Sequence, residues 1–336
     1  MKHRNLPLVS LASRLLCAIV ALVSPTLVAA QTDGYPNKAI TLVIPFAAGG
    51  AIDNAGRLVG EQLSKVLKQP VVVDNKPGAN GAIGMAYVLN RPADGYTLVM
   101  NGASKTVLKT LQPSMAIDPM KDLLPVSMVA KVPLVLVVSA STGVKDFAGF
   151  KDYLSKNPNK VAWGVAGVGT GPHLAGTALF RAMKADPITA QYAGSALIHS
   201  DLIAGRVHVA MDSLGPIMPH ITNGTVVPVA TLSQSREKEL PNVPTLAELG
   251  FSDFNEVRYE AWNSIDVSAK TPDAIVQLLN RAMAEVLKSP ELKARIERVG
   301  MSAFEPMSVK DTLDFTIKVS ARLTPLAAEL SKQAPK

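Results

Sequence analysis

Cysteine is almost absent from this chain of 336 residues, since Cys17 is the only one. A disulfide needs two cysteines and a cysteine metal centre needs several, so the sequence excludes both within one chain. Removal of the first 30 residues would leave no thiol at all, and this excludes thiol catalysis.

A strong excess of one charge is also lacking. The chain has 34 basic and 27 acidic residues, a net charge of +7, and without Lys2, Arg4 and Arg14 it has 31 basic residues against 27 acidic ones. The basic residues are scattered rather than clustered, so we expect no nucleic-acid partner. Beyond the first 30 residues, no apolar run is long enough to predict a transmembrane helix.

Residues 1–30 have the pattern of a cleaved signal peptide. A basic start with Lys2 and Arg4 precedes an apolar run at 15–23, which is too short to span a bilayer comfortably. Val28-Ala29-Ala30 suits cleavage before Gln31, although an uncleaved anchor is an alternative. Cys17 does not fit a lipid attachment site, because bulky Leu16 precedes it and apolar sequence follows. We therefore expect an exported protein.

Strand-like apolar segments alternate with segments of helical periodicity over the rest of the chain. This alternation predicts an α/β fold in which helices flank the sheets. Roughly 300 residues are enough for two lobes with their own cores. We expect lobe 1 to comprise 31–130 and 256–336 and lobe 2 to comprise 131–255, with crossings at 133–139 and near Trp262. Strands are expected at 39–44, 70–74, 95–100, 133–139, 160–165, 188–192, 206–211 and 226–232.

The first candidate site is the loop between the strand at 39–44 and the following helix. Its two glycines can adopt positive φ, and the helix start adds unpaired N–H groups and the positive end of a dipole. Such a loop can hold an anion without a basic side chain. Asp53 is also explained simply as a helix-start residue. The candidate ligand-binding residues here are Phe46, Ala47, Ala48, Gly49, Gly50 and Asp53.

A second glycine-rich loop follows the expected strand at 160–165, and a helix begins near Pro172. Pro172 stands where a dinucleotide-binding motif needs its third glycine, and no Lys-Ser/Thr pair marks a phosphate loop. A tight turn that serves packing alone is the simpler alternative. Two such loops, one from each lobe, could hold a carboxylate from both sides. The candidates here are Gly167, Val168, Gly169, Thr170 and His173.

Other polar residues give weaker evidence for a role in binding or catalysis. Asp212, at the end of a strand, could order a water or a ligand donor, and Ser104 could reach the same cleft or be a simple loop hydroxyl. Lys105 is the nearest basic residue, and we expect its replacement to affect binding less than changes in the glycine loops. The histidines after residue 30 have no recognised metal spacing, so we expect no metal and no cofactor. Ser195, His199 and Asp201 are close in sequence, but a catalytic triad is defined by geometry, and no catalytic residue is expected.

Several motifs resemble those of the substrate-binding proteins of tripartite tricarboxylate transporters, the Bug family of periplasmic receptors. They run in order through nearly the whole chain after residue 30. The matching stretches are 35–36, 43–50 with Asp53 and Arg57, 69–84, 94–98, 169–175, 201–205 and 240–250.

This resemblance implies a two-lobed, type II periplasmic-binding fold with its ligand cleft between the lobes. It implies a periplasmic, non-enzymatic solute-binding protein that captures a small carboxylate, largely through backbone groups and water. The partners it implies are the large and small membrane subunits of the permease, and we expect a monomer. Two departures, Ala193 in place of the usual lysine and Ala47 in place of a common proline, predict a less basic and less rigid pocket.

The alternative in another class is a periplasmic sensor that reports to a membrane signalling protein. Neighbouring genes for a permease or a kinase would separate the two. A secreted enzyme is disfavoured by the lack of a nucleophile–base motif. The sequence does not identify the carboxylate.

Overall fold

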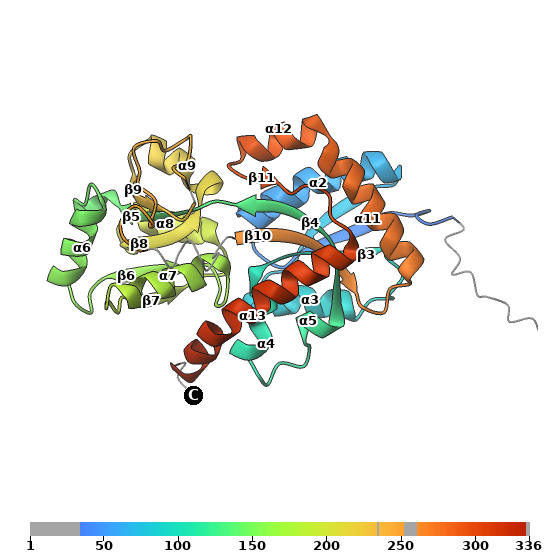
Figure 1. Ribbon diagram of the computed structural model, residues 1–336, viewed down its shortest axis with the longest axis horizontal. Coiled ribbons are helices and arrows are strands. Elements are labelled where there is room, and N and C mark those ends of the chain that lie inside the picture. The colour runs from blue at the N-terminus through green and yellow to red at the C-terminus, as the bar shows by residue number, and fades with distance from the viewer. Residues whose placement is uncertain (1–33, 234, 252–260, 334–336) are drawn as a thin grey trace, which may run out of the picture. The chain divides into compact units, whose positions relative to one another are not determined.

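The computed structural model describes residues 34–233, 235–251 and 261–333. The predicted signal peptide, Cys17, the cleavage site and the predicted lobe boundary at 255/256 lie outside these residues. Within them, two mixed sheets are flanked by helices (Figure 1). This confirms the predicted α/β class with two sheets.

The first sheet has six strands in the order β11-β4-β10-β3-β1-β2. β1 pairs in parallel with β2 and β3, whereas β10 is antiparallel to both β3 and β4. The strands are β1 (Ile40–Ile44), β2 (Val71–Asn75), β3 (Thr97–Gly102), β4 (Leu123–Val132), β10 (Ala261–Ser268) and β11 (Ser302–Ala303).

The second sheet has five strands in the order β7-β6-β8-β5-β9. β6 is parallel to β7 and β8, and β5 is antiparallel to β8 and β9. The strands are β5 (Leu134–Ser139), β6 (Ala162–Val165), β7 (Ile188–Gln191), β8 (Val209–Ser213) and β9 (Val226–Thr231). Only Pro133 separates β4 in the first sheet from β5 in the second, so the chain changes sheets there.

Helices connect most of the parallel strands, because parallel neighbours need a crossover connection and an α-helix usually provides it. The longer α-helices are α2 (Ala51–Leu67), α3 (Ala82–Leu89), α6 (Phe147–Lys156), α7 (Gly171–Ala182), α8 (Ser195–Ile203), α9 (Leu214–Thr222), α11 (Asp273–Lys288), α12 (Pro290–Arg298) and α13 (Val309–Gln333). Two helices have one turn each, α4 (Leu108–Leu111) and α5 (Pro119–Asp122). The 3-10 turns are η2 (Ala79–Gly81), η3 (Ala103–Thr106) and η4 (Ala140–Thr142).

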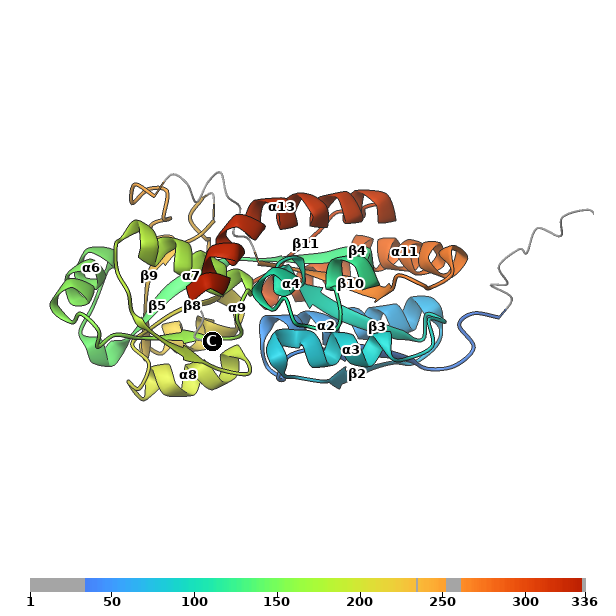
Figure 2. The ribbon, with the colours of Figure 1, turned by 90° about the horizontal axis from the view of Figure 1, so that it is seen from below.

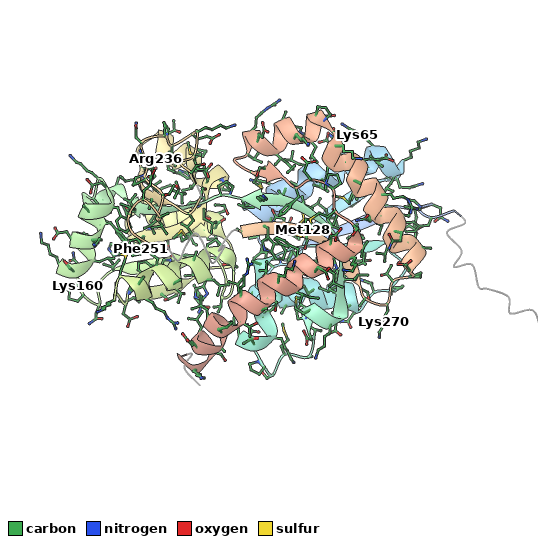
Figure 3. The ribbon with its side chains drawn as sticks, in the orientation of Figure 1. Lys65, Met128, Lys160, Arg236, Phe251 and Lys270 are labelled. Atoms are coloured by element: carbon green, nitrogen blue, oxygen red, sulfur yellow. The ribbon has the colours of Figure 1, made fainter. Side chains whose placement is uncertain are left out.

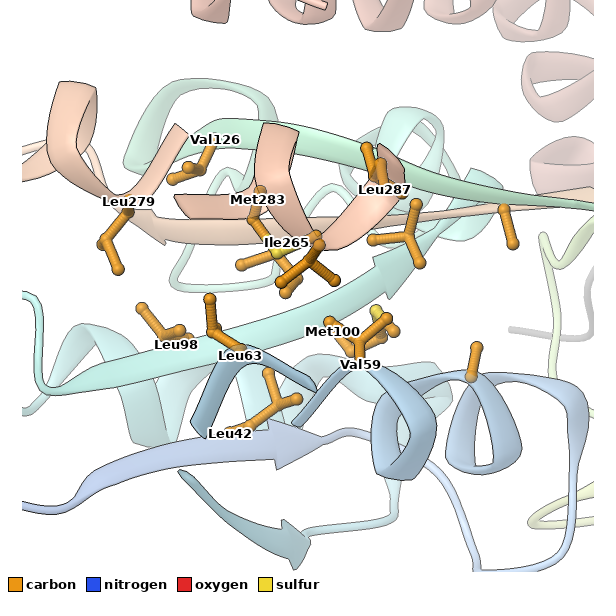
Figure 4. Packing of buried hydrophobic residues seen from close by; sticks show 14 of the residues in the cluster. Leu42, Val59, Leu63, Leu98, Met100, Val126, Ile265, Leu279, Met283 and Leu287 are labelled. Carbon is orange, nitrogen blue, oxygen red and sulfur yellow. The ribbon is translucent and has the colours of Figure 1, made fainter. Parts of the chain in front are cut away.

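Each sheet has its own apolar core. In the first sheet, Leu42 and Met100 pack with Leu63 of α2 and Met283 of α11, and all four are at most 1% exposed (Figure 4). The helical spacing of Val59 and Leu63 turns one face of α2 to this core. Separate clusters cover the two faces of the second sheet. Charged side chains such as Lys160 and Lys270 lie at the periphery, while Met128 lies inside (Figure 3).

Helix α13 contacts the first sheet and a helix that flanks the second sheet. It runs along β4 and then reaches α7 (Figure 2). Leu323 of α13 and Leu174 of α7 share one buried cluster, and Arg181 of α7 pairs with Glu329. In the described part of the chain, no helix is both long and apolar enough to cross a membrane.

Candidate ligand-binding site

A pocket lies where loops that follow strands of both sheets come together. In α/β sheets ligands commonly bind beyond the carboxyl ends of the strands, and this pocket has that position. The lining comes from the loops after β1, β3, β6 and β7, from the ends of β4 and β8, and from the start of β10. The lining residues are Phe46, Ala47, Gly50, Ala51, Ile52, Asp53, Gly102, Ala103, Ser104, Val132, Ala166, Thr170, Gly171, Pro172, Gly194, Ser195, Asp212, Ser213, Ala261, Trp262 and Asn263.

Two helices begin at this pocket without a side-chain cap. Gly50 precedes α2 and Gly194 precedes α8, and neither position supplies a side-chain hydrogen bond to the first turn. The first N–H groups of an α-helix have no intrahelical acceptor, and here no cap side chain supplies one. In α8, the Leu197 amide donates to the Gly194 carbonyl (3.3 Å). A Cβ atom placed on Gly50 would lie 3.2 Å from Ser195 Oγ, so the two helix starts are close together. None of the residues that line the pocket is Lys or Arg.

Asp53 is held by the protein itself. Its carboxylate accepts hydrogen bonds from the Gly49 amide (3.0 Å), from Arg57 (3.0 Å) and from Asn75 (2.9 Å). Burial raises the pKa of Asp53, but these hydrogen bonds outweigh burial and lower it below the ordinary value. The Asn75 amide also donates to the Phe46 carbonyl (3.0 Å). Asp53 thus fixes the conformation of the first loop. The Gly49 amide donates to Asp53 in this arrangement.

The second glycine loop also has internal partners for its amides. Val168 N–H donates to Asn80 Oδ1 (2.9 Å), and Gly169 N–H donates to His173 Nδ1 (3.0 Å). His173 is 6% exposed and stacks on Trp163, and burial lowers its pKa to about 4. His173 is therefore neutral near pH 7, which leaves Nδ1 free to accept the bond.

The pocket brings together seven of the predicted site residues, Phe46, Ala47, Gly50, Asp53, Ser104, Thr170 and Asp212. The other six do not line it, and these are Ala48, Gly49, Gly167, Val168, Gly169 and His173. Direct ligand contact by any of the thirteen residues stays a prediction.

Asp212 and His199 are buried and lie next to the half-buried His220. Its Oδ2 lies 2.6 Å from His199 Nε2, and its Oδ1 accepts from the Ser213 amide (2.7 Å). The His199 ring lies against His220, whose pKa is lowered by burial and by His199. Asp201, which is nearer to His199 in sequence, binds Tyr192 and Arg206 instead.

Lys105 does not line the pocket. It is 2% exposed and forms an ion pair with Asp266, which is fully buried. Burial lowers the pKa of Lys105, and Asp266 opposes this effect. Asp266 also accepts from Asn101 (2.8 Å) and Ser264 (2.7 Å), so the pair ties η3 to β10 next to Ser104.

Several residues of the site were not foreseen from the sequence. Ser195 and Gly194 form an uncapped helix start, and Trp262 and Asn263 line the pocket from β10. Asn263 Oδ1 and Trp262 Nε1 are buried and have no hydrogen-bond partner in the described part of the protein. Asn80, which accepts from the second loop, carried a readable signal, because an Asn-Gly pair such as Asn80-Gly81 favours a left-handed turn. Among described residues, no cluster of three or more His, Cys, Asp or Glu could hold a metal ion.

Comparison with known proteins identifies the class. A family model described as tripartite tricarboxylate transporter family receptor matches residues 55–331. Protein BugT of Bordetella pertussis is 33% identical over 300 residues, which cover 88% of this chain and 90% of that protein. A protein of Agrobacterium vitis, described as a UPF0065 protein, is 30% identical over 332 residues, which cover 98% of this chain and 95% of that protein.

Solved structures agree with the fold. An R. palustris protein solved with adipate superimposes with a TM-score of 0.83 at 29% identity, covering 89% of this chain and 98% of that chain. MatC from Rhodopseudomonas palustris, solved with malate, gives a TM-score of 0.81 at 26% identity, covering 87% of this chain and 100% of that chain. The fold is that of a two-lobed periplasmic solute-binding protein. The chain belongs to the tripartite tricarboxylate transporter receptor family, whose members are periplasmic.

Proposed function

We propose that this protein binds a small carboxylate between its two sheets in the periplasm and delivers it to the large and small membrane subunits of a tripartite transporter. In this proposal residues 1–30 direct export and are removed, and the protein catalyses no reaction. We propose the lobes expected from the sequence, 31–130 with 256–336 and 131–255, with the change of sheet at Pro133, two residues after the expected boundary.

One observation carries the proposal, namely the pair of uncapped helix starts, α2 and α8, that meet across a pocket without basic side chains. Each start presents free N–H groups and about half a positive charge from the helix dipole. Hydrogen bonds from neutral donors to a charged acceptor contribute roughly 1.5–3 kcal/mol each. A few such bonds support useful affinity for a carboxylate, and the relatives solved with malate and adipate show that similar proteins bind such ligands.

The apolar part of the lining fits the carbon skeleton of such a ligand. Phe46, Ile52, Val132 and Trp262 contribute apolar surface to a pocket that is otherwise lined by small residues. Ligand pockets of this kind combine apolar walls with a few polar groups that fix orientation.

Mass spectrometry of small molecules released from gently purified protein identifies the ligand, and calorimetry then compares each acid with its neutral amide. We expect measurable binding of the acid and none of the amide. Recovery of no carboxylate, together with no heat from a broad panel of acids that includes malate and adipate, would refute the proposal.

The variant Gly50→Ala tests the helix starts directly. Its methyl group would enter the space between α2 and Ser195 Oγ, so we expect affinity for the carboxylate to fall about tenfold or more, or about 1.4 kcal/mol. Gly149→Ala in α6 is a matched control, because its Cβ would meet other atoms only at 3.4 Å or more. Equal affinities in the two variants would show that the helix starts do not hold the ligand.

A further inference from the structure

Four consecutive residues at 78–81 have positive φ. The values are 127° for Gly78, 46° for Ala79, 56° for Asn80 and 95° for Gly81. Residues other than glycine rarely adopt this conformation, because Cβ then crowds the backbone. Asparagine tolerates it better than most residues, but a run of four needs a compensating contact elsewhere.

The compensating contact lies on the other sheet. Asn80 Oδ1 accepts a 2.9 Å hydrogen bond from the Val168 amide, which is 88 residues away in sequence. Asn80 follows β2 of the first sheet, and Val168 follows β6 of the second. We call this hydrogen bond the latch.

Both partners of the latch are fixed by their own surroundings. On the first sheet, Gly81 N–H closes the turn onto the Gly78 carbonyl (3.0 Å). On the second, Thr170 Oγ1 donates to the Gly167 carbonyl (2.9 Å), and His173 accepts from Gly169 N–H (3.0 Å).

The second glycine loop also fits tightly against the first sheet around the latch. A Cβ on Gly169 would run into the side chain of Leu111, and one on Gly167 would lie 3.4 Å from Asn80 Oδ1 and 3.5 Å from Phe46. Small residues at these positions allow the backbone carrying Val168 N–H to reach Asn80. The amide of Val168 therefore already has a partner on the first sheet in the arrangement of the two sheets that the structure has.

We propose that Asn80 is a closure residue: it holds the closed arrangement of the two sheets through the Val168 amide, and the left-handed turn at 78–81 serves to aim its side chain. A two-lobed receptor works by closing on its ligand, and any contact made only in the closed state raises apparent affinity by raising the closed population. The effect on ligand affinity rests on the proposed receptor function. The latch itself can be measured without a ligand.

Asn80→Gly is the principal variant. Glycine adopts the left-handed conformation without penalty, so the turn is kept while the acceptor is lost. Asn80→Asp keeps a side-chain oxygen and should retain the latch, and Asn80→Ala also removes the acceptor if the glycine variant fails to fold. Asn159→Gly is the matched control, because Asn159 has a φ of 60° and is exposed in the second lobe.

Two readouts on the ligand-free protein test the proposal. Hydrogen exchange by NMR reports protection of the Val168 amide, and spin labels at Ser114 and Ser200, both exposed, report the distance between the two sheets with Cys17 replaced by serine. We expect Asn80→Gly and Asn80→Ala to reduce Val168 protection about three- to tenfold, the effect of one neutral hydrogen bond, and to lengthen the labelled distance. Asn80→Asp and Asn159→Gly should match the parent protein.

An unprotected Val168 amide in the parent, or unchanged protection in Asn80→Gly, would overturn the proposal. Loss of protection with an unchanged labelled distance would overturn it too, because the bond would then be local. These outcomes are independent of whether a carboxylate binds. If malate or another acid binds, its affinity should fall about three- to tenfold in Asn80→Gly.

Discussion

Replacement of Lys105 by methionine should destabilise the protein strongly. Lys105 and Asp266 form an ion pair that is almost completely buried, and Asn101 and Ser264 complete the hydrogen bonds of the carboxylate. Without the ammonium group, Asp266 keeps a buried charge that only neutral donors stabilise. Removal of one partner of such a pair typically costs about 3–5 kcal/mol.

Urea unfolding followed by far-UV circular dichroism measures this loss. Lys38→Met is the matched control, since the Lys38–Asp94 pair is exposed and spans 3.7 Å, and such pairs contribute at most about 1 kcal/mol. Adding Asp266→Asn to Lys105→Met removes the stranded charge and should recover part of the stability. A Lys105→Met protein that loses no more stability than Lys38→Met would refute the reasoning.

Two further predictions concern backbone contact and pH. Gly215→Ala should lower the melting temperature far more than Gly149→Ala, because a Cβ on Gly215 would overlap the Val299 carbonyl; equal melting temperatures in a thermal scan would contradict this. For His173, burial lowers the pKa from 6.5 to about 4, so the unfolded chain binds more protons between these values. The free energy of unfolding is therefore highest with respect to this group above about pH 6.5. It decreases as the pH falls, by about 2 kcal/mol at pH 5. Urea unfolding of His173→Gln should lack this part of the pH dependence, and identical profiles for the two proteins would exclude it.

Most of the strand pattern could be predicted from the sequence. All eight expected strands are present within a few residues of their expected limits, because apolar β-rich runs between glycine and proline turns are a strong signal. Three strands of the first sheet, β4, β10 and β11, were not among those expected, although a crossing was expected near Trp262 in β10. In β4, Pro125 argues against a strand. In the structure Pro125 is paired with Asp266 at a register shift between β4 and β10, where a missing N–H is tolerated.

The candidate site was predictable only in part. The glycine loops and Asp53 lie at or beside the pocket, since loop composition and helix starts are local properties. The partners of the loop amides depend on tertiary contacts, such as Asn80 with Val168, and local sequence does not specify these. For the same reason the burial of Lys105 against Asp266, 161 residues away, could not be foreseen.

A crystal structure with the bound acid tests the central claim most directly. We predict that the carboxylate oxygens lie within hydrogen-bond distance of the first-turn amides of α2 and α8, with no lysine or arginine in contact, and that the latch is intact. A carboxylate bound by a basic side chain, or seated away from these helix starts, would contradict the account.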